Sequence, residues 1–559
     1  MPTTPPFSSA TSWADAPADA DFWSSLAQTL LPPYVNACRW FAGKARSQTG
    51  FAIPTVHTLP LADGDVAYLL ILEATYANGL PERYLLPLSF VTDRASQTLP
   101  FRLADVPAKG RIGEAKLAGR AGTLIDAIYD ERFRQALFAG IQQNQTVVQT
   151  SGQLSFCRGK GLDEDDDALS SQVLPVDSSN SAMTFGGKYF LKLYRKLFAE
   201  TNPEVDMVQF LTDESHFDHV PAFGGSIVWQ QGDTDVTLGM VQRMVANDTD
   251  SWAQTGDYLN DFLYAVPQRI FSVRENVFEQ VELLAKRTGE MHCALYQPIR
   301  DGKPGNPAFT PEPFTDDYRE FVTRRFSGLL ERRYALLIDN YTTLDPQAQR
   351  LAWVFMEAKE MIEAFIADFR TRPLDSLRIR IHGDYHLGQV LAVTNDNGKD
   401  DFVVIDFEGE PECSISERKI KHSPLKDVAG MIRSYHYAVS AKLFNSTETE
   451  DLDPDYLQRV SDRWFNLIRD TFLNAYFGVF GAPHPLFKNN NETNYLLLIY
   501  LLEKAVYELG YEISYRPSWV KIPLKGIIDV VREIEKIRLS NGDDRADVPM
   551  LQTGLLQGR

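Results

Sequence analysis

The first half of the chain is patterned in short apolar runs that predict β-strands. Residues 67–77 and 83–92 are rich in strand-forming side chains, and the turn-forming sequence NGLPE between them predicts a hairpin. A second hairpin is predicted at 182–197, where Gly186-Gly187-Lys188 separates two apolar runs. Helical spacing of apolar residues at 126–141 interrupts this pattern. This part of the chain is therefore expected to combine sheets with a few helices.

From about residue 252 onward the pattern becomes helical. Apolar residues recur every three or four positions at 271–295, 313–339 and 351–369, which predicts three long helices. After them, 378–411 contains two short β-branched runs, each ending in a polar loop. We therefore expect a large helical region with a short strand-containing insertion.

These changes of pattern divide the chain into four parts. Residues 1–20 are rich in Pro, Ser, Thr and Ala and are expected to be a disordered lead-in. A small α/β domain is expected at 21–145 and a β-rich lobe at 146–245. A helical lobe is expected at 246–559.

Composition narrows the class of protein. The net charge of −19 makes the chain a poor candidate for binding nucleic acid through bulk charge. The four cysteines are far apart and form no CxxC pair, which argues against a zinc site or a disulfide framework. No apolar run is long enough to span a membrane, and the N-terminus lacks the features of a secretory signal. A cytoplasmic location with no membrane partner is expected.

The sequence IHGDYHLGQ carries the clearest chemical signal. Asp384 follows a short apolar run, Gln389 lies five positions later, and Asp406 ends the next β-branched run. Phosphoryl transfer needs a carboxylate that orients the attacking hydroxyl, together with an amide and a second carboxylate that hold Mg²⁺. We therefore interpret Asp384 as a catalytic base and Gln389 and Asp406 as metal ligands.

IHGDYHLGQVL followed by VIDFEGEP resembles the maltokinase family, relatives of the aminoglycoside phosphotransferases. Gln at position 389 is usual in maltokinases, where other relatives carry Asn. RWFAGKAR at 39–46 resembles the signature of the family's N-terminal cap domain, and 178–197 resembles its nucleotide lobe. Cys413-Ser414 departs from the Arg-Pro type of sequence common there. The resemblance implies an α+β, two-lobed, protein-kinase-like (aminoglycoside-phosphotransferase-like) fold with an N-terminal α/β cap domain at 21–145.

The same resemblance implies an ATP site. Lys192 would contact the phosphates, although a solvent-facing position on an edge strand is the alternative. Its carboxylate partner would be Asp206, where the family usually has Glu, and Glu204 is a near neighbour. The loop that begins at Ser178 contains no GxGxxG sequence, so an ordinary polar turn remains the alternative. The phosphate loop and the hinge would contribute the remaining ATP contacts: Ser179, Asn180, Ser181, Gln242, Met244 and Val245.

A late helix is the candidate for holding the acceptor. Lys504, Glu508 and Tyr511 are spaced at i, i+4 and i+7, so they share one face, and Tyr507 lies beside them. Charged groups suit sugar hydroxyls, and aromatic rings suit a pyranose face. With the resemblance, these four residues, together with His386 and Arg433, are interpreted as sugar-binding. The alternative is an exposed, salt-bridged amphipathic helix.

The resemblance implies a kinase that uses ATP and Mg²⁺ to convert maltose into maltose 1-phosphate and ADP, which feeds α-glucan synthesis from trehalose. Two alternatives stay open. One is a kinase of the same fold for another sugar or an amino sugar such as glucosamine. The other is a weakly catalytic binding module that partners trehalose synthase, an enzyme to which the family occurs fused.

Overall fold

The computed structural model describes residues 6–92, 100–150, 152–164, 169–175, 179–247, 249–299, 305–395, 397–481 and 483–541. The chain divides into two compact units. The first comprises 1–214 with 221–245, and the second comprises 215–220 with 246–559.

The first unit begins with a mostly antiparallel sheet. Its strands lie in the order β1-β5-β6-β4-β3-β2, and β12 (Lys196–Leu197) pairs with β4. The ordered strands are β1 (Phe7–Ser9), β2 (Gln48–Pro60), β3 (Val66–Tyr76), β4 (Glu82–Thr92), β5 (Arg111–Leu117) and β6 (Arg120–Asp126). The hairpin predicted at 67–92 is confirmed as β3 and β4. Helices α1 (Ala20–Gln28) and α2 (Leu31–Ala37) lie between β1 and β2 in the chain.

The expectation of a disordered lead-in is wrong for residues 6–20; residues 1–5 lie outside the described part. β1 pairs in parallel with β5. The side chains of Phe7 and Trp13 are buried in the core of this sheet. Trp13 Nε1 donates to the carbonyl oxygen of Val66 at 2.8 Å. Composition predicted disorder because Pro, Ser and Thr outnumber these two aromatic residues, whose burial holds the segment in place.

A second antiparallel sheet follows in the same unit, in the order β7-β8-β13-β14-β11-β10-β9. Its strands are β7 (Thr146–Gln149), β8 (Gly152–Arg158), β9 (Ser171–Val173), β10 (Ser181–Phe185), β11 (Tyr189–Leu193), β13 (Phe223–Gln231) and β14 (Thr234–Arg243). The predicted second hairpin is confirmed as β10 and β11, which turn at Gly186 and Gly187, both with positive φ. Helix α3 (Glu131–Gln142) packs on the sheet, and α4 (Pro203–Gln209) begins after its N-cap, Asn202.

A buried ion pair joins the two sheets of this unit. Arg195 follows β11, and its guanidinium contacts the carboxylate of Asp126, at the end of β6, at 2.5 Å. The same guanidinium donates to the carbonyl oxygen of Leu85 on β4 at 3.2 Å. Both charged side chains are almost completely buried. The first sheet and the second sheet therefore share a buried polar link, and one hydrophobic core contains residues of both.

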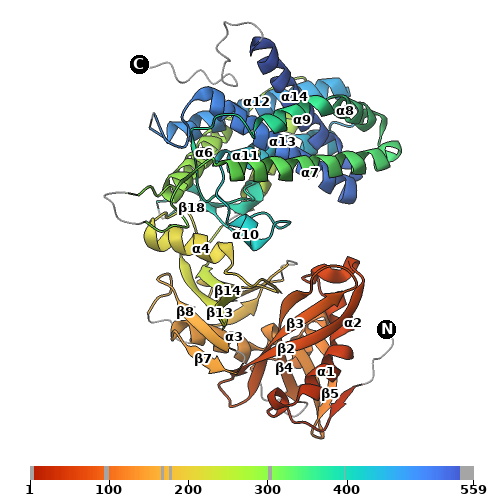
Figure 1. The fold of residues 1–559 in the computed structure, drawn as a ribbon, viewed down its shortest axis with the longest axis vertical. Helices are drawn as coiled ribbons and strands as arrows, with labels where there is room; N and C mark the ends of the chain where they lie inside the picture. Colours follow the sequence, from red (N-terminus) through yellow and green to blue (C-terminus); the bar gives the residue numbers. More distant parts are fainter. Residues whose placement is uncertain are drawn as a thin grey trace. The chain divides into compact units, whose positions relative to one another are not determined.

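The second unit is mainly helical (Figure 1). Its helices are α5 (Ser251–Ala265), α6 (Glu275–Leu295), α7 (Asp316–Asn340), α8 (Pro346–Glu357), α9 (Lys359–Asp368), α10 (Ile415–Arg418), α11 (Leu425–Asn445), α12 (Pro454–Gly478), α13 (Asn490–Tyr515) and α14 (Lys521–Asn541). Helix α13 packs against α7, α11 and α14, and its segment 492–502 is buried on all sides. None of the helices in the described ranges has an apolar stretch long enough to cross a bilayer.

Two small sheets complete this unit. One joins β15 (Thr249–Asp250), β18 (Val390–Thr394) and β19 (Asp400–Val404), and the other joins β16 (Glu312–Pro313) and β17 (Leu377–Arg378). The β18–β19 hairpin is the strand-containing insertion that the sequence predicts. It places the loop before β18 beside the loop after β19.

Candidate active site

The loop that carries Asp384 is held by a buried carboxylate on α11. Asp427 accepts hydrogen bonds from the backbone N–H groups of His382, at 2.8 Å, and Gly383, at 2.9 Å. It also contacts His292 Nε2 at 3.1 Å. Burial alone would raise the pKa of Asp427, but His292 and these other partners hold it below its ordinary value. The backbone on the N-terminal side of Asp384 is thereby fixed.

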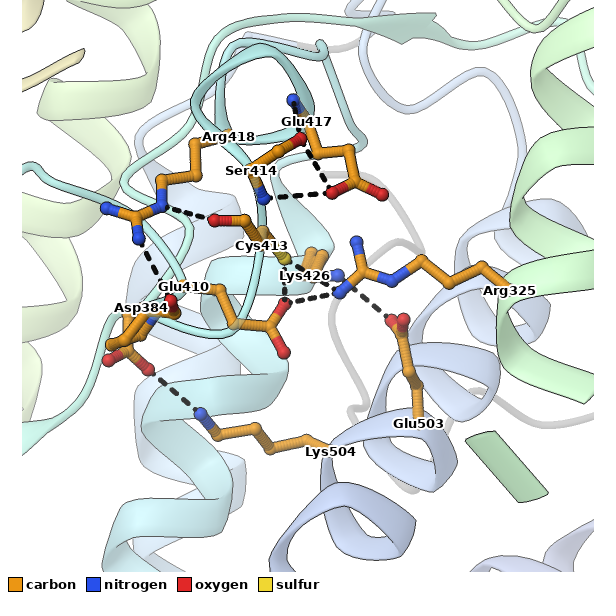
Figure 2. Close-up of polar contacts among 11 residues, drawn as sticks. Arg325, Asp384, Glu410, Cys413, Ser414, Glu417, Arg418, Lys426, Glu503 and Lys504 are labelled. Atoms are coloured by element: carbon orange, nitrogen blue, oxygen red, sulfur yellow. Dashed lines mark hydrogen bonds and ion pairs between the residues drawn. The ribbon is translucent and has the colours of Figure 1, made fainter. Parts of the chain in front are cut away.

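Asp384 is paired with a cation from α13. Its Oδ1 lies 3.1 Å from Lys504 Nζ (Figure 2). Burial would raise the pKa of Asp384, but Lys504 and the neighbouring His386 lower it below its ordinary value. Burial would likewise lower the pKa of Lys504, and Asp384 and Glu508 raise it. Asp384 is therefore held as an ionised carboxylate, the state that a proton acceptor requires.

Gln389 and Asp406 meet at the base of the β18–β19 hairpin. Gln389 Nε2 donates to Asp406 Oδ2 at 3.0 Å, and the N–H of Ile405 donates to the carbonyl oxygen of Gln389 at 3.0 Å. Asp406 has a φ of +66°, an uncommon conformation for a residue with a side chain. Such strained positions cluster at functional sites. An amide oxygen and a carboxylate side by side are the oxygen donors that suit Mg²⁺, so this pair fits a magnesium ion.

The Asp384 loop and the Asp406 loop are packed on each other. His382 Nε2 lies 2.9 Å from the carbonyl oxygen of Ile405, and its ring lies 4.8 Å from that of Phe407. With the Gln389–Asp406 bond, these contacts bring together the three residues that the motif predicts. All of them lie in the second unit.

Lys192, in the first unit, forms a salt bridge with a carboxylate on α4. Lys192 Nζ lies 2.9 Å from Glu204 Oε2, and the Tyr194 hydroxyl donates to the same oxygen at 2.7 Å. This corrects the prediction that assigned the partner to Asp206. The helix begins at Pro203, which places Glu204 in its first turn, and the Glu204 side chain is only 2% exposed. The inward-pointing lysine predicted on this strand is thus paired with a buried glutamate.

The predicted phosphate loop is engaged with Arg195. The Arg195 backbone N–H donates to Asn180 Oδ1 at 3.3 Å, and its Nε donates to Ser181 Oγ at 2.8 Å. Ser179 is exposed, and Ser178 lies outside the described residues. The Asn180 and Ser181 side chains therefore have a structural role in fixing the start of β10.

The predicted hinge, 242–245, begins with the last two residues of β14. Gln242 is paired with Phe190 of β11, and the N–H of Met244 donates to the carbonyl oxygen of Lys188 at 2.7 Å. Val245 is the last residue of the first unit. The segment is therefore held at the end of the second sheet.

A cavity of about 230 Å³ adjoins Asp384 within the second unit. Gly383 and Lys504 form part of its wall. Charged residues from α7, α11, α13 and the 410–417 loop form most of the rest, and Figure 2 shows the pairs among them. Arg325 Nη2 lies 2.8 Å from Glu410 Oε2 and 2.9 Å from Cys413 Sγ. Lys426 Nζ lies 3.1 Å from Glu503 Oε2. The wall is therefore rich in fixed hydrogen-bonding groups.

The sugar-binding residues predicted on α13 are only partly in this cavity. Lys504 and Tyr507 line it, together with Tyr500 and Glu503. These four lining residues are spaced at i, i+3, i+4 and i+7 from Tyr500, so they share one face of α13. Glu508 lies off this face by about a quarter turn of helix.

The other predicted sugar residues lie outside the cavity wall. Glu508 pairs instead with Arg433, whose Nη2 lies 2.7 Å from Glu508 Oε2. Tyr511 is on the lining side of the helix but about two turns beyond Lys504. It is 46% exposed, and its ring contacts that of Tyr515 in a tilted arrangement with centroids 4.9 Å apart. His386 accepts a hydrogen bond from the N–H of Gly388 and lies two residues after the base.

Sequence reasoning missed Arg325, Glu410, Lys426, Tyr500 and Glu503, which line the cavity. The available signal was charge inside an apolar pattern, because Glu503 and Lys504 interrupt a buried helix. Burial would raise the pKa of Glu410, but Lys426 and Arg325 hold it below its ordinary value. The cavity thus offers ionised carboxylates beside paired cations.

Comparison with known proteins places this geometry in context. Residues 34–130 match the model of the maltokinase N-terminal cap domain. A glucosamine kinase from Streptacidiphilus jiangxiensis is 23% identical over 362 residues, which cover 64% of this chain and 73% of that protein. A solved glucosamine kinase in complex with glucosamine, ADP and inorganic phosphate superposes with a TM-score of 0.60 at 18% identity, over 89% of this chain and 98% of that one. A second crystal form gives a TM-score of 0.62 at 18% identity, over 91% and 99%.

These matches confirm two of the expectations. The chain has a kinase-like fold shared with glucosamine kinase, preceded by an α/β cap domain. Its resemblance to maltokinases is confirmed by the cap domain and by this fold.

Proposed function

We propose that this maltokinase-like chain is an ATP-dependent kinase that phosphorylates a hydroxyl group of a sugar. The observation that carries the proposal is the Asp384–Lys504 pair at 3.1 Å, which adjoins a polar cavity and lies in the loop that also supplies Gln389. An ionised carboxylate at the edge of a cavity lined with hydrogen-bonding groups is the arrangement that hydroxyl activation requires.

In the proposed reaction Asp384 orients the acceptor hydroxyl and takes its proton. The acceptor oxygen forms a bond to the γ-phosphorus of ATP while the bond from that phosphorus to the ADP oxygen breaks. Gln389 and Asp406 would hold Mg²⁺, which supplies charge neutralisation at the phosphates. Lys192, oriented by Glu204, contacts the nucleotide phosphates. The backbone around Ser179 covers the phosphates, and the 242–245 segment pairs with adenine.

Maltose is the acceptor that we propose, with phosphorylation at the anomeric hydroxyl. Tyr500 and Tyr507 give the cavity aromatic faces for one pyranose ring. Tyr511 continues the same side of α13 beyond the cavity and is exposed, which suits a second ring. The maltokinase type of cap domain supports the same choice. The product, maltose 1-phosphate, would feed α-glucan synthesis from trehalose.

An amino sugar is the second candidate acceptor, and a separate observation favours it. Glu410 is an ionised carboxylate on the cavity wall, which is the group that an ammonium substituent needs. The relatives that superpose on this chain are named as glucosamine kinases, one of them in complex with glucosamine. Phosphorylation of glucosamine would then take the place of phosphorylation of maltose.

A coupled assay of ADP release tests both candidates in one experiment. Maltose, glucose, glucosamine and water alone are compared at saturating ATP and magnesium. We expect kcat/KM for maltose to exceed that for glucosamine by about tenfold or more, a difference of about 1.4 kcal/mol in transition-state binding. A preference for glucosamine would overturn the choice of maltose.

The Asp384→Asn variant is the control for the chemistry. We expect kcat to fall by about 10²–10⁴-fold or more while the circular dichroism spectrum stays unchanged. Near-normal turnover in this variant, or the absence of sugar-dependent ADP release in the parent protein, would contradict the kinase proposal.

A further inference from the structure

Loop 408–413 lies directly on the loop that carries the proposed base. A Cβ atom added to Gly383 would lie 3.3 Å from Gly409 Cα, and both glycines have a positive φ, of +87° and +76°. The backbones of the two loops are therefore in close contact, in conformations that glycine adopts without strain. Beyond this contact, Glu410 and Cys413 enter the wall of the cavity beside the base, here called the acceptor cavity. The position of this one loop thus affects both the cavity and the base.

Arg418 holds loop 408–413 through its main chain. Its Nε donates to the carbonyl oxygen of Cys413 at 3.0 Å (Figure 2). Its Nη2 donates to the carbonyl oxygen of Pro411 at 2.9 Å, and a longer contact of 3.4 Å joins Nη1 to that of Glu408. One guanidinium thus spans the loop from its start to its end. A guanidinium suits this task because its donors form a rigid planar fork.

Helix α10 fixes the backbone that presents Arg418. The helix has only four residues, Ile415–Arg418, and a helix of this length is not stable in isolation. A capping box supports it, in which Ser414 Oγ accepts from the N–H of Glu417 at 3.3 Å and Glu417 Oε2 accepts from the N–H of Ser414 at 2.9 Å. The side chain of Ile415 is buried and anchors the same turn. The guanidinium is therefore presented to the loop from a fixed support.

A second arginine holds the side chains of the same loop. Arg325 Nη2 lies 2.8 Å from Glu410 Oε2 and 2.9 Å from Cys413 Sγ, and Arg325 lines the acceptor cavity. Arg418 is not among the described residues that line this cavity. Arg325 can therefore contact a bound molecule directly, whereas Arg418 would act on such a molecule through the main chain of the loop.

We propose that Arg418 is a positioning residue for the acceptor sugar, because it fixes loop 408–413 and so sets the distance between the cavity wall and Asp384. This inference rests on the proposed function, which takes the cavity as the acceptor site. A bound sugar must contact the wall while its hydroxyl reaches the base, and small misplacements of reacting groups are costly in rate. Asp406, at the start of the same segment, is held separately by Gln389. Loosening the loop should therefore affect the sugar more than ATP.

Steady-state kinetics of two Arg418 variants test this role. We expect Arg418→Gln to raise the KM for maltose by about tenfold and the KM for ATP by less than about twofold. Arg418→Lys keeps the charge but loses the planar fork, so the KM for maltose should rise by only about threefold. Arg319→Gln is the matched control, because Arg319 also donates to a backbone carbonyl, that of Arg372 at 2.9 Å, and lies outside the cavity wall. The control should change either KM by less than about twofold. Glucosamine is assayed in parallel as the second acceptor.

Hydrogen–deuterium exchange tests the position of the loop without turnover. Peptides that cover 408–414 should exchange faster by about tenfold or more in Arg418→Gln and at the parent's rate in Arg319→Gln. Thermal unfolding checks that each variant folds, and Arg418→Lys carries both readouts if Arg418→Gln does not fold.

Three outcomes would overturn the proposal. These are equal exchange of the loop in the Arg418 variants and the parent protein, equal rises in the KM for the sugar and for ATP, and full recovery by Arg418→Lys, which would show that charge alone suffices. An absence of sugar-dependent ADP release by the parent would instead contradict the proposed function, while exchange would still decide whether Arg418 holds the loop.

Discussion

Lys504 holds Asp384 through a contact of 3.1 Å between the lysine Nζ and Oδ1 of the carboxylate. The two residues are 120 positions apart in the chain and come from the catalytic loop and from α13. As the proposed base, Asp384 would enter the reaction beside a fixed positive charge, and its pKa would depend on this helix.

The first prediction concerns the pH dependence of catalysis. Lys504 lowers the pKa of Asp384, so the active, ionised base persists as the pH falls towards the ordinary carboxyl range, near 4. In Lys504→Met the burial of Asp384 remains while the attraction is lost, so the pKa of Asp384 rises. The acidic limb of the kcat/KM profile should move to higher pH. An acidic limb at the same pH in both proteins would show that Lys504 does not set the pKa of the base, whatever the loss in rate.

The second prediction separates the two carboxylates of α4. Glu204→Gln removes the partner of Lys192 and should raise the KM for ATP and lower kcat, with the KM for the sugar unchanged. Asp206→Asn is the matched control, two residues away, and should change these constants much less. Steady-state kinetics with ATP varied at saturating sugar measure the difference. A larger effect from Asp206→Asn would restore the family-based assignment.

The third prediction concerns the metal. Asp406→Ala removes a carboxylate that fits Mg²⁺, and activity should then be lost at magnesium concentrations that saturate the parent protein. Gln389→Ala should raise the magnesium requirement less severely, because the amide carries no charge. Titration of activity with MgCl₂ measures both effects. Full activity of the parent protein in excess EDTA would contradict the assignment.

The fourth prediction distinguishes the two ends of the sugar site. Tyr507 lines the cavity, so Tyr507→Ala should raise the KM for every accepted sugar. Tyr511 lies beyond the cavity, so Tyr511→Ala should raise the KM for a disaccharide but not for a monosaccharide. Losing one such contact is expected to cost about 0.5–1.5 kcal/mol, or roughly 2- to 13-fold in KM. Equal effects of Tyr511→Ala on maltose and glucose would remove Tyr511 from the site.

The parts of the site that lie close together in sequence could be predicted. Asp384, Gln389 and Asp406 belong to one hairpin and its flanking loops, so their spacing carries the geometry. The wall of the acceptor cavity could not be predicted, because Arg325 and Glu410 are 85 positions apart and meet only through tertiary packing. Periodicity placed Lys504 and Tyr511 on one side of a helix but could not show where along that side the cavity ends.

Two local errors have similarly local causes. The prediction of Asp206 rather than Glu204 rests on the resemblance to the family, while the first turn of α4 brings Glu204 to Lys192. The prediction that the N-terminal lead-in is disordered rests on its average composition. Average composition gives no weight to two aromatic side chains that are buried in a core. Fold class was easier to predict because it depends on the sum of many such patterns.

The buried contact between Arg195 and Asp126 limits how this chain can be recombined with its relatives. A chimera that joins a foreign cap domain to the second sheet of this unit would leave Arg195 buried without its carboxylate unless the donor supplies one at the same place. Removing one partner of a buried pair generally destabilises a protein by about 3–5 kcal/mol. A crossover point between residues 126 and 195 should therefore yield insoluble protein, whereas an exchange that carries both residues together should fold. The cap sheet and the sheet that follows it are therefore expected to tolerate exchange only as a pair.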